Sequence, residues 1–233
     1  MYGILKRVMQ MAWPVMLSYV AVGMPCGVLA AQAGMTPLMC LVLSATFVSG
    51  SGQFMMSNLW LAGVPAPSIA ASVAAISARF ALYSASLAPH IKHASRAETL
   101  AVSATLTEEA YGISLEQLTS DPDWTCKYAF TLNIVLIATW AISVWAGSII
   151  GSAVDIPTSL AGFVCTSLFT YLLFCQSASR GNVLAALVSA GTVAVLKAVG
   201  AAGVAVPVAA VAGVIIAVVA GVFTPVSADK GGE

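Results

Sequence analysis

Residues 126–151 read CKYAFTLNIVLIATWAISVWAGSIIG, and Lys127 is the only charged residue among them. A helix that crosses a lipid bilayer needs about 20 consecutive, predominantly apolar residues. This stretch meets that requirement along its whole length. It therefore predicts a membrane-spanning helix over 126–151.

The composition of the whole chain agrees with this interpretation. Hydrophobic residues make up 60% of its 233 positions, charged residues only 8%, and the mean hydropathy is +0.96. A soluble domain is typically about 25% charged, so a soluble protein of this composition would have almost nothing to place on its surface. Nine basic and nine acidic residues give a net charge of zero, without the basic excess of a nucleic-acid-binding protein. We predict an integral protein of the lipid bilayer with no nucleic-acid partner.

Seven other stretches share the apolar character of 126–151, and the connections between them are short. We therefore predict an all-α fold, a polytopic membrane helical bundle of seven or eight transmembrane segments, forming a single domain over residues 1–233. The expected spans besides 126–151 are 11–31, 38–62, 66–89, 97–115, 158–176, 182–200 and 204–223.

The stretch 97–115 gives the weakest signal, because its hydrophobicity is modest and acidic residues lie in it. It either spans the membrane or enters and returns as a re-entrant element, and other helices have to cover its backbone in both cases. If all eight segments span, the positive-inside rule favours a cytoplasmic N-terminus. The basic residues then divide into a cytoplasmic set of Lys6, Arg7, Lys127, Arg180 and Lys230 and an external set of Lys92 and Arg96.

A faint internal repeat is also present. Residues 21–54 and 143–176 each contain a run of small residues, a short turn with proline and an apolar helix with Ser and Thr. A repeat offset by four true spans would be parallel, whereas one offset by three would be inverted, as in many transporters.

Arg79 is the most unusual residue of the segment 66–89, because it lies near the middle of a predicted span. A guanidinium group inside a membrane is costly and needs an anion or a hydrated cavity. Arg79 can form a structural ion pair or handle a substrate or ion, unless the true boundaries place it at the membrane surface. The polar residues of this segment share one helical face and are Ser68, Ser72, Arg79, Tyr83, Ser86 and His90.

The segment 38–62 carries a second polar face within the sequence SATFVSGSGQFMMSN. Gly50 and Gly52 permit close approach of another helix, or local unwinding next to Gln53. The simplest alternative is helix packing through small residues, with Gln53 hydrogen-bonded across the interface. The polar face consists of Thr46, Ser49, Gln53 and Ser57.

The sequence LTEEAYG at residues 106–112 supplies two adjacent acids. In a helix Thr107 and Tyr111 share a face, whereas Glu108 and Glu109 point about 100° apart. One glutamate can face a cavity while the other reaches a polar edge, and a carboxyl group in a cavity of low dielectric constant can carry a proton reversibly. The alternative is a pair of loop glutamates at the membrane surface.

A buried cation, an acid pair, an amide and hydroxyl groups among apolar side chains suit an apolar zwitterion such as an amino acid. We expect Arg79 to bind its carboxylate, and Glu108 and Glu109 to bind its ammonium group or a coupled proton. Gln53 and Tyr83 are the expected orienting donors. The predicted substrate site comprises Ser49, Gly50, Gln53, Arg79, Tyr83, Thr107, Glu108 and Glu109.

The chain resembles the AzlC-type branched-chain amino-acid permeases over most of its length. Three motifs carry the resemblance, and they are SATFVSGSGQF, ARFALYSASLAP and LTEEAYG, in this order and at this spacing. The resemblance implies a protein of the inner membrane that exports branched-chain amino acids as the large subunit of a two-component exporter. It also implies a partner, a small membrane subunit of the AzlD type.

Two positions depart from the pattern of that family. Ser77 stands where the family usually has an acid or Asn two residues before the motif arginine, and Glu108 stands in place of an Asp. Both positions lie where the substrate is expected. A different apolar amino acid, or another small zwitterion, is therefore an alternative substrate.

Other classes of protein fit the sequence less well. An intramembrane serine protease needs a Ser and a His within hydrogen-bond reach, but His90 and His93 lie beside charges at a helix end. The five cysteines are scattered and the ligands do not converge, so no metal site, cofactor or enzymatic activity is expected. The charges do not repeat as in a pore filter. A subunit that only scaffolds its partner is the remaining alternative to a transporter.

Overall fold

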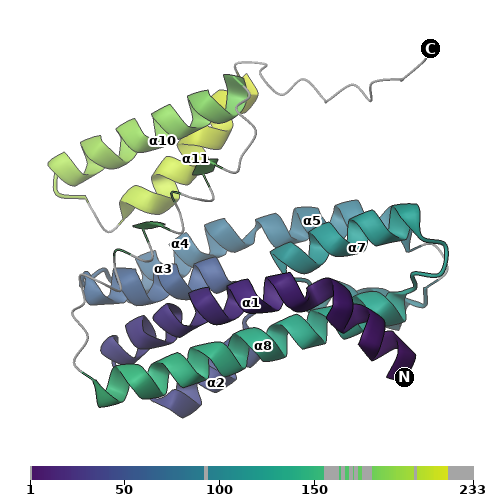
Figure 1. The fold of residues 1–233 in the computed structure, drawn as a ribbon. Helices are drawn as coiled ribbons and strands as arrows, with labels where there is room; N and C mark the ends of the chain where they lie inside the picture. The colour runs from purple at the N-terminus through teal and green to yellow at the C-terminus, as the bar shows by residue number, and fades with distance from the viewer. Residues whose placement is uncertain are drawn as a thin grey trace. The chain divides into compact units, whose positions relative to one another are not determined.

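The computed structural model describes residues 2–91, 94–154, 180–201 and 204–219, together with residues 163, 166–167, 170 and 173–174. All the elements that it describes are helices (Figure 1). The two longest are α1 (Tyr2–Gln32) and α8 (Cys126–Ala153). Between them lie α2 (Pro37–Thr46), α3 (Gly50–Leu61), α4 (Ala66–Ser77), α5 (Arg79–Leu87), the 3₁₀ helix η1 (Ala88–His90), α6 (Arg96–Ala104) and α7 (Glu108–Ser120), and α8 is followed by α10 (Arg180–Ala198) and α11 (Ala205–Val219).

Four helices among the described residues are long and apolar enough to cross a membrane. They correspond to the expected spans 11–31, 66–89, 126–151 and 182–200, and they extend over Gly3–Gln32, Ala66–His90, Cys126–Ala153 and Gly181–Ala198. The all-helical fold is thereby confirmed for the described residues, and four of its helices are candidate membrane spans. The count of seven or eight spans and the internal repeat stay predictions, and the expected span 158–176 lies almost wholly outside the described residues.

The chain forms two compact units. The first consists of residues 1–62 and 76–165, and the second consists of residues 63–75 and 166–233. All eight residues of the predicted substrate site belong to the first unit. The helices of that unit therefore determine the geometry of the site.

Two aromatic contacts show that α1 and α8 run in the same direction. The Arg7 guanidinium carbon lies 6.0 Å from the ring centroid of Trp124, just before α8 begins. Further along both helices, the ring centroids of Tyr19 and Trp140 are 5.4 Å apart. We call the side of the unit where both helices begin the Arg7 end, and the opposite side, where α8 reaches Gly151, the Gly151 end.

Glycines allow the backbones of α1 and α8 to touch. A Cβ atom on Gly27 would lie 2.0 Å from the carbonyl oxygen of Val144, and one on Gly147 would lie 2.1 Å from the carbonyl oxygen of Met24. Small residues permit this close approach between helices in lipid. The two helices lie side by side along their length (Figure 1) and form the frame of the first unit.

The structure divides the expected span 38–62 into α2 and α3. Phe47 ends α2 in an extended conformation, with φ −110° and ψ 97°. Ser49 then begins α3 as its N-cap, and its Oγ accepts the backbone N–H of Gly52 at 3.1 Å. A serine in this position favours a helix start over continuation of the previous helix. The interruption lies against α8, since a Cβ atom on Gly50 would be 2.9 Å from the indole of Trp140.

The structure also divides the expected segment 97–115, here into α6 and α7. Thr107 caps α7 by accepting the backbone N–H of Ala110 at 3.2 Å. Asn133 of α8 is fully buried, and its Nδ2 donates to the carbonyl of Val102 and to Oγ1 of Thr105, both at 3.0 Å. An interrupted helix inside a membrane needs such partners from the protein.

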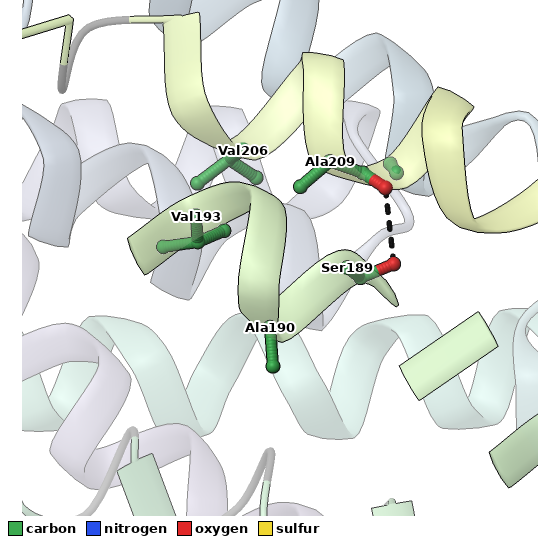
Figure 2. A pocket seen from close by; sticks show the side chains of 6 residues that line it. Ser189, Ala190, Val193, Val206 and Ala209 are labelled. Atoms are coloured by element: carbon green, nitrogen blue, oxygen red, sulfur yellow. Dashed lines mark hydrogen bonds between the residues drawn. The ribbon is translucent and has the colours of Figure 1, made fainter. Parts of the chain in front are cut away.

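In the second unit α10 packs against α11 and leaves an open pocket between them (Figure 2). Ser189 of α10 donates its hydroxyl to the carbonyl of Ala209 at 3.0 Å. The pocket offers no charged side chain and none of the predicted site residues, so it does not match the chemistry of a zwitterion. Its lining residues are Ser189, Ala190, Val193, Val206, Ala209 and Ala210.

Candidate functional site

Arg79 and Glu108 form an ion pair at the start of two helices. Arg79 is the first residue of α5 and Glu108 the first residue of α7, and Nη2 of the arginine lies 2.8 Å from Oε2 of the glutamate. The same Nη2 donates to Oγ of Ser51, in the first turn of α3, at 2.7 Å. Ser51 is buried, and the two charged side chains are 26% and 31% exposed. One guanidinium group therefore joins the N-terminal turns of α3 and α7.

The guanidinium group of Arg79 has donors to spare. Its Nε is buried and has no acceptor among the described residues. Its central carbon lies 5.5 Å from the ring centroid of Phe80, which covers part of the group. An arginine can bind a carboxylate through two parallel N–H groups. Arg79 therefore retains hydrogen-bonding capacity for an anion beyond Glu108.

Two stacked tyrosines, Tyr83 and Tyr111, lie next to the Glu108 side of the ion pair. The hydroxyl of Tyr83, one turn after Arg79 on α5, lies 3.4 Å from Oε1 of Glu108. Its ring stacks on that of Tyr111 with the centroids 4.6 Å apart, and the Tyr111 hydroxyl is 3.0 Å from Oγ of Ser86. The Glu108 carboxylate is thus held by a cation on one oxygen and a phenol on the other.

Glu109 points away from this pair, toward α1. It accepts a hydrogen bond from the hydroxyl of Tyr19, whose ring packs edge-on against Trp140 of α8. Glu108 therefore faces α5 while its neighbour faces α1, a divergence that follows from adjacent positions on a helix. Acids in the first turn are also favourable to the helix itself, because the N-terminus of a helix dipole is positive.

Gln53 lies apart from Arg79 and is occupied by the interruption between α2 and α3. Its Oε1 accepts from Ser44 at 2.9 Å and from the indole nitrogen of Trp140 at 3.2 Å. Its Nε2 donates to the carbonyl of Phe47, the residue that follows α2, at 2.8 Å. In this structure the Gln53 amide fixes the helix break and does not contact the ion pair.

The other predicted site residues stabilise helix starts or permit close packing of helices. Ser49 and Thr107 are the N-caps of α3 and α7, and Gly50 provides the close contact with Trp140. These residues set the position of the two helix starts that carry Ser51 and Glu108. The structure thus brings Arg79, Tyr83 and Glu108 together and places Ser49, Gly50, Gln53 and Thr107 around them as support.

Reasoning from the sequence did not assign Tyr19, Ser51 or Trp140 to the site. Tyr19 and Trp140 each carry a polar tip in the middle of an apolar helix, and such tips usually find a partner when buried. That property is a usable signal. Ser51 lies within the run SGSG, where hydroxyls on neighbouring positions cannot be ranked without knowing where the helix starts.

The structure gives no support to a serine protease in the described residues. The Ser51 hydroxyl accepts from Arg79, while Nδ1 of His90 lies 3.3 Å from the carbonyl of Ser86. His93 lies outside the described residues. Within those residues there is also no cluster of side chains suited to a metal ion.

Comparison with known protein families assigns the chain to one of them. A family model described as "AzlC protein" matches residues 14–154, more than half of the sequence. The chain belongs to the AzlC family. The matched range contains α3, α5 and α7, and therefore the complete Arg79–Glu108–Ser51 cluster. AzlC proteins are a membrane transport family, so the four apolar helices belong to a membrane transport protein.

One relative of this AzlC protein is the "Inner membrane protein YgaZ" of Escherichia coli (strain K12). The two chains are 24% identical over an alignment of 185 residues that covers 76% of each chain. No solved structure matches the chain. The relative and the apolar helices together place the protein in a membrane.

Proposed function

We propose that this AzlC protein transports branched-chain or similar apolar amino acids, and that it exports them across the inner membrane. The observation that supports the proposal most strongly is the Arg79–Glu108 pair, because it offers one group of each sign within a bundle of mainly apolar helices. A free amino acid carries the two complementary charges. A solute without charged groups would form an ion pair with neither side chain.

The substrate can bind by replacing the two partners of this ion pair. Without substrate, Arg79 and Glu108 neutralise each other, so neither charge is left unpaired in a medium of low dielectric constant. A zwitterion can replace the internal pair, with its carboxylate on the Arg79 guanidinium and its ammonium on Glu108. One internal pair is replaced by two pairs with the substrate, so each protein charge keeps a partner of opposite sign that offsets its desolvation cost.

The surroundings suit an apolar side chain. Phe80 packs against Arg79, and the stacked rings of Tyr83 and Tyr111 adjoin Glu108. Tyr83 contacts Glu108 by its hydroxyl and can orient the carboxylate toward an ammonium group. Aromatic surface next to a charged pair favours amino acids with apolar side chains over polar ones.

Glu109 is the candidate for coupling to protons, with Glu108 as a second candidate. Glu109 is held by a neutral tyrosine hydroxyl, so it can change its protonation state without breaking an ion pair. Proton coupling predicts that export depends on the proton gradient. Efflux that is unaffected when the pH gradient and membrane potential are both collapsed would contradict it.

The protein is proposed to act as the large subunit beside a small AzlD-type membrane protein, with its N-terminus in the cytoplasm.

The test of the proposed function is valine efflux from cells loaded with a valine dipeptide, with the small subunit co-expressed. We expect wild-type cells to export valine, and Arg79→Ala and Glu108→Gln to reduce export at least tenfold while still reaching the membrane. Matched controls are Arg96→Ala and Glu116→Gln, which make the same chemical changes at exposed positions on α6 and α7.

The outcomes separate the alternatives. If wild-type cells export no valine, the substrate assignment fails and other small zwitterions have to be tested in the same cells. If Arg79→Ala exports as well as wild type, the ion pair is structural, and a scaffold role for this subunit is favoured. Loss of export in the two controls as well would mean that the site is not responsible.

A further inference from the structure

We infer that the N-terminal part of α1, residues Gly3–Trp13, is a hinged gate that closes the Arg7 end of the proposed transport site. Pro14 is the hinge of the gate, and the contact of Arg7 with Asp121 is its latch. The inference rests on the proposed transport function, because a gate needs a site to close. The observations that carry it are contacts within the first unit and the position of a proline inside α1.

Pro14 interrupts the hydrogen bonding of α1 directly after the gate. A proline inside a helix has no N–H to donate, and its ring crowds the carbonyl four residues earlier, here that of Gln10. Helices bend sharply at such positions. Figure 1 shows that the N-terminal part of α1 turns away from the axis of the rest of the helix. The gate can therefore change its angle at a place where one helical hydrogen bond is already missing.

The two parts of α1 are attached by different kinds of contact. After Pro14 the backbones of α1 and α8 touch, and a Cβ atom on Gly27 would lie 2.0 Å from the carbonyl oxygen of Val144. Before Pro14 the gate instead buries the side chains of Val8 and Ala12. Buried side chains can separate and repack more easily than two backbones in direct contact. We therefore expect movement before Pro14 and a fixed helix after it.

The latch joins the gate to the connection between α7 and α8. Arg7 forms an ion pair with Asp121, and its guanidinium carbon lies 5.6 Å from the ring centroid of Tyr128 and 6.0 Å from that of Trp124. The second carboxylate oxygen of Asp121 accepts the backbone N–H of Asp123 at 3.0 Å, so the acceptor for Arg7 is held in place by its own turn. The Arg7 side chain is 40% exposed. Exposed ion pairs and cation–π contacts are individually weak, which allows the latch to open reversibly.

The gate lies between the transport site and the Arg7 end. Helix α7 begins at the site with Glu108 and meets α1 twice, through Tyr19 with Glu109 and through Arg7 with Asp121. The two contacts are separated by the same length of helix on α1 and on α7, about 18 Å at about 1.5 Å per residue. The two helices therefore run in opposite directions along this boundary. The gate forms the part of the boundary that is nearer to the Arg7 end.

Ser114 adds an independent observation on this stretch of α7. It lies between Glu109 and Asp121, it is fully buried, and its hydroxyl has no hydrogen-bond partner among the described residues. A buried hydroxyl nearly always has a partner, either from the protein or from water. Water that enters when the gate swings open would supply that partner. The unpaired hydroxyl therefore favours opening while the latch favours closing, so both states of the gate are accessible.

The position of the gate fits the proposed direction of transport. With the N-terminus in the cytoplasm, as proposed above, the Arg7 end faces the cytoplasm. An exporter takes its substrate from that side. The open gate would admit the amino acid toward Arg79 and Glu108, and the closed gate, the state seen here, would separate the bound substrate from the cytoplasm.

The test is the access of water to position 114 in sealed vesicles of both orientations. The native cysteines are replaced by alanine, Ser114→Cys is introduced, and a charged methanethiosulfonate that reacts with thiolates in water is added outside. We expect slow labelling in this background, and labelling about tenfold faster once Arg7→Gln or Asp121→Asn removes the latch. The faster reaction is expected from the face at the Arg7 end. Lys6→Gln and Asp123→Asn change the neighbouring exposed charges and should leave the rate unchanged.

Salt provides a second readout with the latch intact. Because the Arg7 side chain is partly exposed, a high salt concentration screens its attraction to Asp121. We expect salt to accelerate the labelling of Ser114→Cys in the presence of Arg7 and to have no such effect after Arg7→Gln. Equal salt dependence of the two proteins would show that the ion pair does not control the gate.

An unchanged labelling rate after Arg7→Gln would overturn the inference, and so would faster labelling from the opposite face. If Ser114→Cys does not fold, spin labels at the exposed positions Gly3→Cys, on the gate, and Glu116→Cys, on α7, measure the movement instead. A longer distance between the labels is then expected after Arg7→Gln, and an identical distance distribution would contradict the gate. Neither readout needs a substrate, so failure of the gate and failure of the proposed transport function are detected separately.

Discussion

The indole nitrogen of Trp140 lies 3.2 Å from Oε1 of Gln53, so a residue of α8 holds the break between α2 and α3. Gln53 is 2% exposed and uses its amide three times, toward Trp140, Ser44 and the carbonyl of Phe47. Removing a side chain that leaves buried partners unsatisfied costs about 1–3 kcal/mol, whereas losing one of several bonds costs about 1 kcal/mol.

We therefore expect Gln53→Leu to lower the free energy of unfolding more than Trp140→Phe does. Thermal denaturation of the purified protein in detergent is the measurement. The two changes also share one interaction, so the double variant should be less destabilised than the sum of the single variants. Strict additivity would show that the two side chains do not interact in the folded protein.

Substitutions of the ion pair are expected to affect the stability of the protein and its transport activity differently. Arg79→Ala leaves Glu108 without its cation, and Glu108→Ala leaves the guanidinium without its anion, each at a cost of about 1–3 kcal/mol for this partly exposed pair. The double variant removes both charges and should recover much of that stability while remaining unable to export. Recovery of export in the double variant would show that neither charge binds the substrate.

Tyr19→Phe tests the contact with Glu109. The change removes the hydroxyl that Glu109 accepts from but keeps the ring against Trp140. We expect a melting temperature close to that of wild type and a reduction of export of several-fold, with an altered dependence on pH. Tyr128→Phe makes the same chemical change next to Arg7 and should leave export unchanged. Equal effects of both variants would argue against a special role for Tyr19.

Asn133 connects the frame to the junction of α6 and α7. Asn133→Leu keeps the volume roughly but leaves the Val102 carbonyl and the Thr105 hydroxyl without this donor, at an expected cost of about 1–3 kcal/mol. Denaturation in detergent gives the loss of stability, and protease sensitivity of the 104–107 connection gives its location. A variant as stable as wild type would mean that water or lipid head groups replace the amide.

The close contact of α1 and α8 predicts a sharp difference between glycines. Gly27→Val should destabilise the protein by at least about 1–3 kcal/mol, because its Cβ would overlap the Val144 carbonyl and the helices would have to separate. Gly112→Ala is the control, since a Cβ there meets nothing within 4 Å and alanine favours the helix. Similar melting temperatures for Gly27→Val and wild type would contradict the packing described.

Much of the site could be predicted from the sequence, and the rest depends on where helices stop. Arg79 and the two glutamates are recognisable because a charge in an apolar segment needs a partner. The sequence allows unwinding next to Gln53 and a re-entrant element over 97–115, but it does not locate the breaks at Ser49 and Thr107, since a capping serine or threonine looks the same in sequence as one inside a membrane helix. Once those breaks are known, Ser51 becomes a first-turn residue, while Gln53, expected to face the substrate, turns inward to hold the backbone.

The glycine contact between α1 and α8 also has a consequence for biosynthesis. Gly27 and Gly147 belong to the same interface but are separated by about 120 residues of chain. At about 5–20 residues per second, α1 waits roughly 6–24 s for the helix that covers its glycine face. During that interval the nascent α1 needs a temporary partner, such as lipid or an insertion factor. Slowed translation between residues 33 and 125 should therefore increase degradation of this protein more than slowing after residue 154.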